Sequence, residues 1–368
     1  MARYRRYIEF AALLLLAAAI VWWFGRRLDW QQVKHALANS DWRLILLAGF
    51  VILVAYFWRA LRWRAFLAPL AKASIKEIWI ATTVGFGAVL LIGRAGEVVR
   101  PVVLPMRDQR VRPAASFVTI MVERVYDSMT VLLLFGVNLL WFAPTGIASS
   151  EFARARQLGW LLISLLLVAL GALVLFRLKS KKLLKWLDGR VNARSPINRR
   201  VKRAILSILE QLATALGVLA NARELAVTIG WSAALWLSVA AANLIVFRAF
   251  GLHFGFSHAL FVLGWSMIGS AIPTPGGAAG AFHAITGAAL VMLGVAREQA
   301  AAIAIILHLV DFAPAALFGL FYFLRGDVNF ARLRSLTATR AVEHAVEDEK
   351  IKIAGNTRQL EAVTQMTK

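Results

Sequence analysis

A series of long apolar stretches, separated by short charged segments, constrains this chain more than any other feature. A helix that crosses the hydrocarbon core of a bilayer needs roughly 20 apolar residues, within a range of about 17–25. Stretches of this length, or close to it, lie at about 8–24, 42–58, 116–142, 158–176, 225–249, 258–272, 277–295 and 299–324. Because lipid offers no hydrogen-bond partners to the backbone, such stretches fold as helices. The sequence therefore predicts an all-α polytopic membrane protein with about eight transmembrane helices.

The basic residues lie between these stretches and indicate their orientation. The chain has a net charge of +22, and the segment 177–203 alone holds 11 Lys and Arg against one acidic residue. Cytoplasmic loops carry an excess of Lys and Arg. We therefore place this segment in the cytoplasm, together with the loop that carries Arg59, Arg62 and Arg64. This topology requires the glycine-interrupted stretch at 77–93 to enter the membrane and return on the same side.

The predicted organisation is one transmembrane domain over 1–330 and a cytoplasmic tail over 331–368. Re-entrant or broken helices are expected near 77–100 and 258–295. Within the domain, 177–222 is predicted to be an amphipathic linker held on the cytoplasmic surface by apolar burial and anionic lipid. A protein-docking platform is the alternative for this linker. The expected location is the inner (plasma) membrane of a bacterium, with several membrane passes and both termini in the cytoplasm.

Composition excludes several kinds of site. The chain has no cysteine, so disulfide bonds, thiolate metal sites and a cysteine nucleophile are excluded. The sequence shows no metal-ligand cluster, nucleotide-binding loop or nucleophile motif. No nucleic-acid-binding motif accompanies the basic charge, which instead suits the anionic headgroups of a bilayer. We therefore predict no metal, no cofactor and no nucleic-acid partner.

Ionisable side chains or helix-breaking residues interrupt the apolar stretches at three places. Ionisable side chains inside a membrane usually pair with one another or line a cavity. The first place is the motif GRAGEVVRP, where Arg94, Glu97 and Arg100 would share one helical face. Gly93 and Gly96 interrupt the helix here. Broken backbone at membrane depth is tolerated where it is buried in protein or lines a wet cavity. An interfacial loop with a surface ion pair is the alternative.

The second place is the motif ERVYDS, near the start of a long apolar stretch. Glu123 and Asp127 are spaced i, i+4, while Arg124 and Asp127 are spaced i, i+3, so these side chains are neighbours on a helix. We interpret the two motifs as one buried network, in which Arg94 or Arg100 of the first motif meets an acidic residue of the second. A cluster of snorkelling charges at the membrane boundary is the alternative.

The third place is the motif PTPGG, between two apolar stretches. Its helix-breaking residues are Pro273, Pro275, Gly276 and Gly277. The flanking stretches are therefore predicted to be two half-helices that meet inside the membrane. The N-terminus of the second half-helix would offer free N–H groups and a positive dipole end to an anionic headgroup. A tight turn outside the membrane is the alternative.

Three further ionisable residues lie in the last apolar stretches. His283 follows the PTPGG motif, and His308 and Asp311 are spaced i, i+3 in the last stretch. A pair at this spacing is commonly a structural hydrogen bond. A functional role in the membrane interior is the alternative.

GRAGEVVRP, ERVYDS and PTPGG, in this order, resemble the lysylphosphatidylglycerol synthase transmembrane-region family, also called the flippase-like domain family. The resemblance covers roughly residues 5–325. It implies a helical fold with re-entrant elements and, for some members, translocation of an aminoacylated phospholipid between leaflets. The matching positions are Arg94, Glu97, Arg100, Glu123, Arg124, Asp127, Pro275, Gly276 and Gly277.

The sequence departs from this family at two positions. Phe282 and His283 stand where members commonly have a Glu, and His308 stands near where they often have an Arg. The resemblance therefore implies that a His–His or His–Asp arrangement replaces a Glu–Arg pair, with a change of substrate or of coupling. The bifunctional synthases carry an aminoacyltransferase domain that this sequence lacks. We therefore expect a stand-alone member that is not an enzyme.

These observations predict an integral membrane lipid transporter. It would be a flippase or scramblase that moves a phospholipid or lipid-linked headgroup between the leaflets. The arginines of the first two motifs would bind phosphate, since guanidinium matches phosphate bidentately. The carboxylates would hold these arginines or take up protons, and His283 and His308, if buried, would couple transport to protons. The expected partner is an anionic phospholipid or lipid-linked headgroup, with a homo-oligomer and a lipid-modifying enzyme as further partners left open.

Two other functions stay open on the sequence. A membrane-embedded lipid-modifying transferase would use Glu123 or Asp127 as a base. A non-catalytic scaffold for a lipid or cell-envelope pathway would recruit an enzyme through the basic segment 177–203.

Overall fold

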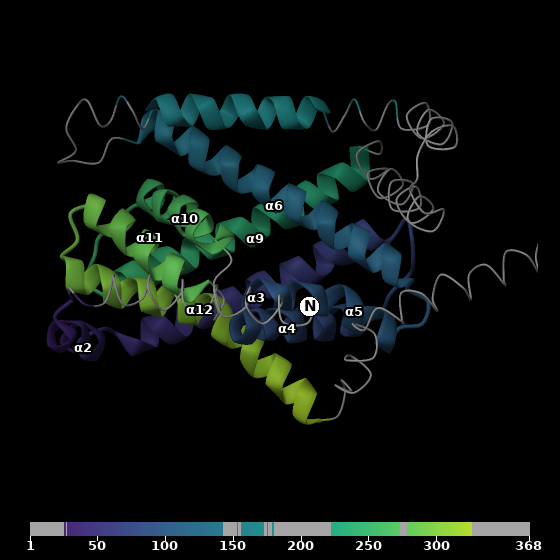
Figure 1. Cartoon of the computed structure of the whole chain (residues 1–368), viewed down its shortest axis with the longest axis horizontal. Helices are drawn as coiled ribbons and strands as arrows, with labels where there is room; N and C mark the ends of the chain where they lie inside the picture. The colour runs from purple at the N-terminus through teal and green to yellow at the C-terminus, as the bar shows by residue number, and fades with distance from the viewer. Residues whose placement is uncertain are drawn as a thin grey trace, which may run out of the picture. The chain divides into compact units, whose positions relative to one another are not determined.

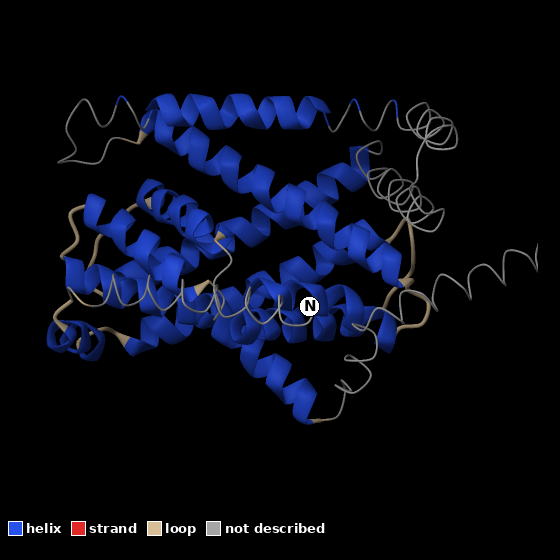
Figure 2. Ribbon diagram, viewed as in Figure 1, coloured by secondary structure: helices blue, strands red, loops and turns tan. Residues whose placement is uncertain are grey.

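The computed structural model describes residues 26, 28–142, 153, 156–172, 175, 179, 222–272 and 278–325. Within these residues the regular structure is helical and contains no strand (Figure 2). Three predicted features lie outside the described residues: the apolar stretch at 8–24, nearly all of the linker at 177–222, and the tail at 331–368.

The helices carry the labels of Figure 1. They are α2 (Trp30–Ala38), α3 (Trp42–Leu67), α4 (Ile75–Ile92), the 3₁₀ helix η1 (Gly93–Val98), α5 (Val99–Arg107), α6 (Pro113–Trp141), α9 (Ala222–Ala249), α10 (Phe256–Ala271), α11 (Ala279–Met292) and α12 (Arg297–Leu324). A further helix spans Arg156–Ala172. The chain divides into a compact unit over Met1–Phe321 and a second unit over Tyr322–Lys368. The contacts described below all lie within the first unit.

Several of these helices have the length and composition of membrane spans. Among the described residues, Trp42–Leu67, Arg223–Ala249 and Arg297–Leu324 are long and apolar enough to cross a membrane. Shorter apolar helices are Arg156–Ala172, Phe256–Ala271 and Ala279–Met292. The all-α membrane fold predicted from the sequence is confirmed.

α3 is longer than the sequence predicted. The apolar stretch was expected to end at residue 58, with Arg59, Arg62 and Arg64 in a cytoplasmic loop, yet the helix continues to Leu67. Arg64 is exposed, but Arg59 and Arg62 are buried. The loop assignment of Arg59 and Arg62 was therefore wrong. Hydropathy counts every arginine as unfavourable within a membrane helix, but these two arginines pair with acidic side chains inside the protein.

α4, η1 and α5 form a helical hairpin (Figure 1). Gly96 of η1 lies so close to α4 that an added Cβ would stand 2.4 Å from the backbone nitrogen of Val89. Arg107 in the last turn of α5 pairs with Glu77 in the first turn of α4. The two ends of this element therefore lie together. The chain therefore turns back on itself over this element; that it enters and leaves the membrane on one side, as expected for 77–100, stays a prediction.

α10 and α11 form a second helical hairpin and lie side by side in Figure 1. The hydroxyl oxygens of Ser266 and Thr286 are 2.9 Å apart across the pair. A Cβ added to Gly269 would stand 3.0 Å from the Cα of Phe282. This pairing is the one predicted for two half-helices near 258–295. Pro273, Pro275, Gly276 and Gly277, which link them, lie outside the described residues.

The two halves of the chain thus repeat one order of elements. A long helix, a helical hairpin and a second long helix follow one another as α3, α4–α5 and α6, and again as α9, α10–α11 and α12. α3 and α9 pack extensively against each other and join the halves. Paired broken elements of this kind are found around the binding sites of membrane transporters.

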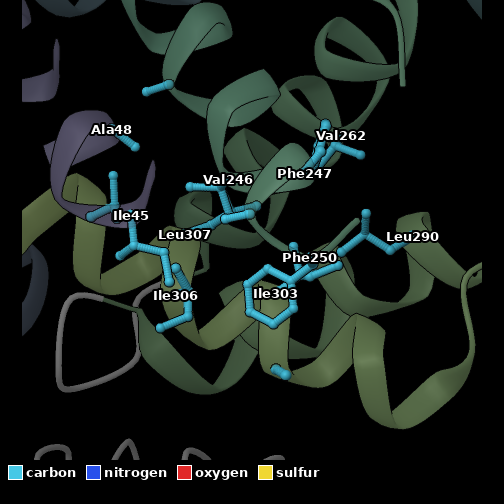
Figure 3. Close-up of a cluster of buried hydrophobic side chains, with 14 of the residues drawn as sticks. Ile45, Ala48, Val246, Phe247, Phe250, Val262, Leu290, Ile303, Ile306 and Leu307 are labelled. Carbon is cyan, nitrogen blue, oxygen red and sulfur yellow. The ribbon is translucent and has the colours of Figure 1, made fainter. Parts of the chain in front are cut away.

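Buried apolar side chains hold α3 against the second half (Figure 3). The labelled members are Ile45, Ala48, Val246, Phe247, Phe250, Val262, Leu290, Ile303, Ile306 and Leu307. In lipid, close packing rather than the hydrophobic effect holds helices together, and small residues permit it. α4 meets α12 in this way, since a Cβ added to Gly87 would stand 3.2 Å from the Cα of Ala316.

Candidate functional site

Charged side chains from three helices meet in the interior of the first half. α3 supplies Arg59 and Arg62, α5 supplies Arg100, and α6 supplies Glu123, Arg124 and Asp127. We call these six residues the arginine cluster. Each pair on one helix is spaced i, i+3 or i, i+4, or is adjacent, so that neighbouring turns direct the side chains to one place.

Glu123 is the centre of the arginine cluster, and its side chain is fully buried. Arg100 donates to it from both terminal nitrogens, at 2.8 Å and 3.1 Å. Arg124 donates at 2.8 Å and Arg59 at 3.3 Å. A terminal nitrogen of Arg62 lies 3.7 Å away. One buried carboxylate therefore contacts all four guanidinium groups.

Asp127 binds three of the same guanidinium groups one helical turn further along α6. Arg62 donates to one carboxylate oxygen at 2.7 Å, and Arg59 donates to the other at 3.0 Å. A terminal nitrogen of Arg124 lies 3.2 Å from the second oxygen. Arg62 also donates to the hydroxyl of Ser232 on α9 at 3.1 Å. The cluster is thereby anchored to the second half of the chain.

Aromatic rings form a wall beside the arginine cluster. The ring of Phe86 on α4 lies 4.8 Å from the guanidinium carbon of Arg59 and 5.1 Å from that of Arg100. Trp63 lies 4.6 Å from Arg100. Cations are attracted to ring faces at such distances, by roughly 2 kcal/mol or more when desolvated. Gly85 leaves room for this arrangement, since a Cβ there would stand 2.0 Å from the Cγ of Arg100.

The described side chains of the cluster carry more positive than negative charge. Four guanidinium groups face the two carboxylates of Glu123 and Asp127, and Glu97 acts electrostatically on Arg124. Even with Glu97 included, one positive charge is unbalanced. In addition, the buried Nε atoms of all four arginines have no hydrogen-bond partner within the described structure. Buried charges and donors without partners are costly, so the arrangement favours an anion with several acceptor oxygens.

Access to the arginine cluster differs among its members. The side chains of Arg62, Arg100 and Glu123 are 0%, 2% and 0% exposed, whereas Arg124 is 33% exposed. Arg124 therefore lies at the open side of the cluster, and an anion from outside would meet it first.

The structure brings together some of the residues that the sequence singled out. Arg100 of the first motif contacts Glu123 of the second, which is one of the predicted pairings. Gly93 begins η1, and Gly96 packs against α4. The side chain of Arg94 lies outside the described part of the structure, so its predicted pairing stays a prediction.

A second group of polar side chains lies in the second half. The rings of His283 on α11 and His308 on α12 meet edge to face, with centroids 5.0 Å apart. His308 is 4% exposed, and the Nε2 atom of His283 is buried with no hydrogen-bond partner among the described residues. The main-chain oxygen of Asp311 accepts a hydrogen bond of 2.7 Å from the hydroxyl of Tyr56 on α3. We call His283, His308 and Asp311 the histidine–aspartate cluster.

Sequence reasoning missed two of the four clustered arginines and the ring that faces them. Arg59 and Arg62 follow an apolar stretch and were assigned to its flanking loop. A signal was present, because Ala60, Trp63 and Leu67 continue an apolar pattern of helical spacing, i, i+3, i+7, past residue 58. Nothing in the sequence indicated that Phe86 would face the arginines.

The chemistry of the cluster is that of guanidinium and carboxylate groups. Within the described residues, no group of three or more His, Asp or Glu could hold a metal ion. The fold and this cluster together define a membrane protein with a buried, positively charged group of side chains in its interior.

Comparison with known proteins identifies the family. The model of the lysylphosphatidylglycerol synthase TM region matches residues 10–319, which is most of the chain, and the protein belongs to this family. Its sequence is also similar to a protein of Haloferax volcanii named glycosyltransferase AglD, with 31% identity over 149 residues. That match covers 39% of this chain and 23% of the relative, so the chain corresponds to under a quarter of the relative's length.

Proposed function

We propose that this protein moves a phosphate-bearing lipid between the two leaflets of its membrane, and that the arginine cluster binds the phosphate. The excess of positive charge in the buried cluster carries this proposal. A phosphate group would supply the missing negative charge and acceptors for the unpartnered guanidinium nitrogens. Membership of a family of lipid-related membrane regions supports a lipid as the bearer of the phosphate.

The depth of the cluster suits a lipid headgroup. Arg59 follows Trp42, the first residue of α3, by 17 residues, which corresponds to about 25 Å of helix. The hydrocarbon core is about 30 Å thick, so the cluster would lie near one interface. The basic loops indicate that this is the cytoplasmic face. We propose that the protein is an inner-membrane protein with both termini on that face.

A lipid-modifying transferase is the second candidate, because one relative is named a glycosyltransferase. A general base must take up a proton, and a carboxylate that several guanidinium groups hold in its ionised form is a poor proton acceptor. Both oxygens of Glu123 accept hydrogen bonds from Arg100, and both oxygens of Asp127 accept from arginines of α3. The carboxylates thus hold the guanidinium groups in place. This geometry favours binding and movement of a lipid over catalysis.

Translocation is tested in liposomes that contain the purified protein and a headgroup-labelled fluorescent phosphatidylethanolamine. A membrane-impermeant quencher is added outside. The wild-type protein is expected to expose the protected inner-leaflet lipid, and Arg124→Gln is expected to slow this exposure at least tenfold. Arg124 is the appropriate target because it is partly exposed, and Glu123 keeps three other arginine contacts. Arg110→Gln is the matched control, since the Arg110 side chain is 65% exposed and pairs with Asp108 in the loop before α6.

An unchanged rate in a correctly folded Arg124→Gln protein would contradict the role of the cluster. If the wild-type protein exposes no labelled lipid but incorporates sugar from a nucleotide sugar into lipid, the transferase candidate replaces the transporter.

A further inference from the structure

Asp311 occupies an unusual position in α12. It is near the middle of a helix that is long and apolar enough to cross the membrane. Within the described part of the chain its carboxylate has no ion pair, and the hydrogen bond from Tyr56 goes to its main-chain oxygen. An ionised carboxylate at such depth costs roughly 2.5–3.5 kcal/mol on insertion scales. A carboxylate that picks up a proton avoids this cost.

The groups around Asp311 come from every helix that packs near it. α3 contributes Tyr56, and Arg59 acts on Asp311 electrostatically. α11 contributes His283, whose ring meets that of His308 on α12 itself. α4 meets α12 at Thr83, Val84 and Gly87, which carry no charge. α10 carries one titratable residue, His258. It lies in the first turn of that helix and stacks on Phe254, which precedes the helix. Among the described groups, Arg59 is thus the cation that interacts with the charge of Asp311.

The histidine pair gives the proton a place to move. The Nε2 atom of His283 is buried and has no hydrogen-bond partner in the part of the chain that the structure describes, so it can accept or donate a proton without first breaking a hydrogen bond there. His308 faces this ring and lies one turn before Asp311 on the same side of α12. Imidazole groups change charge between about pH 5 and 8, and they recur with carboxylates in the proton relays of transporters.

Aromatic side chains connect this group to the arginine cluster. Tyr56 binds the main chain at Asp311, and its ring meets Phe86 edge-on with centroids 5.1 Å apart. Phe86 in turn faces Arg59 at 4.8 Å. Arg59 therefore belongs to both groups. It forms ion pairs with Glu123 and Asp127, and it interacts electrostatically with Asp311.

We propose that the histidine–aspartate cluster is a proton-binding site whose occupancy sets the affinity of the arginine cluster for phosphate. An ionised Asp311 competes with the phosphate for Arg59. A protonated Asp311 carries no charge, so Arg59 is available to bind the phosphate. The lipid and the proton therefore favour each other's binding, and the effect is reciprocal. The effect on phosphate affinity rests on the proposed function, whereas proton binding at Asp311 does not depend on it.

The proton site is tested by infrared spectroscopy of the full-length protein in phosphatidylcholine nanodiscs. Spectra are recorded between about pH 5 and 8, the range of interest for an imidazole–carboxylate group. We expect a carboxylic acid band that grows as the pH falls, that is lost in Asp311→Asn and that persists in Asp41→Asn. Asp41 is a matched control, since it caps the start of α3. Asn is isosteric with Asp, and the Asp311 side chain has no ion pair to lose within the described structure, so the variant is expected to fold. A band that is the same in Asp311→Asn and wild type would overturn the proton site.

The coupling is tested by binding short-chain phosphatidylglycerol to the same proteins at about pH 6 and about pH 8. The wild-type affinity is expected to rise severalfold at the lower pH, and Asp311→Asn is expected to bind tightly at both. His283→Gln provides a second variant and is expected to weaken the pH dependence. Equal pH dependence in wild type and Asp311→Asn would overturn the coupling. If no variant binds the lipid at either pH, the proposed function fails, and the infrared result alone decides the proton site.

Discussion

The two halves of this protein share an order of helices but differ in how they treat charge. In the first half, the arginine cluster pairs each buried carboxylate with several guanidinium groups. In the second half, the rings of His283 and His308 meet, and among the described residues Nε2 of His283 has no hydrogen-bond partner and the Asp311 carboxylate has no ion pair. Guanidinium keeps its charge at any physiological pH, whereas imidazole and carboxylate groups can lose theirs. In the functions proposed above, one half holds an anion and the other changes its own charge.

The largest effect is expected in the arginine cluster, whose ion pairs we expect to contribute more to stability than the histidine–aspartate cluster does. Glu123→Gln removes the negative charge that contacts all four arginines, so like charges are left together in the interior. We expect a loss of about 3–5 kcal/mol of unfolding free energy, measured by thermal and denaturant unfolding in detergent. Glu224→Gln, at an exposed position in the first turn of α9, is the control. A stability equal to that of the control would show that the buried pairs contribute little.

The second prediction compares the two hairpins. Gly96→Ala places a Cβ 2.4 Å from backbone of α4, whereas Gly269→Ala places one 3.0 Å from backbone of α11. Overpacking of this kind costs about 1–3 kcal/mol, and we expect Gly96→Ala to be the more destabilising. Gly230→Ala is the control, because nothing lies within 4 Å of its added Cβ. The reverse order of the two losses in unfolding measurements would contradict the tighter turn of the first hairpin.

The third prediction concerns the contact between the halves. Tyr56→Phe keeps the ring beside Phe86 but removes the hydroxyl that donates to the main-chain oxygen of Asp311. We expect a loss of about 0.5–1.5 kcal/mol, seen as a lower unfolding midpoint. An unchanged midpoint would mean that this hydrogen bond does not help to join α3 to α12.

The smallest effect is expected at the histidine pair. His283→Leu removes a ring nitrogen, Nε2, for which the described residues offer no hydrogen-bond partner, so we expect stability to change by less than about 1 kcal/mol. The contrast with Glu123→Gln is then large. A loss as great as that of Glu123→Gln would show that His283 is structural, and would remove the distinction between the two halves.

The sequence predicted well those features that depend on local pattern. Apolar stretches of spanning length indicated the long helices, and the interrupted motifs at Gly93 and Gly96 indicated the first hairpin. Arg59 and Arg62 were lost to prediction because their burial depends on Glu123 and Asp127, more than 60 residues away. No window of hydropathy contains both partners.

The meeting of His283 and His308 illustrates the same limit. Each residue was singled out from its own surroundings, but their contact depends on how α11 returns onto α12. The place of Phe86 against three arginines likewise follows from the packing of α4 on α3 and α5. Tertiary contacts of this kind become visible only when the helices are assembled.

The central claim is that the arginine cluster binds lipid phosphate, and native mass spectrometry tests it most directly. The purified protein is released from detergent with equimolar short-chain phosphatidylglycerol and diacylglycerol of the same chain length. We expect the wild-type protein to retain phosphatidylglycerol in preference to diacylglycerol, and Arg124→Gln to lose this preference while Arg110→Gln keeps it. Equal retention of both lipids by the wild-type protein, or an unchanged preference in Arg124→Gln, would contradict the account.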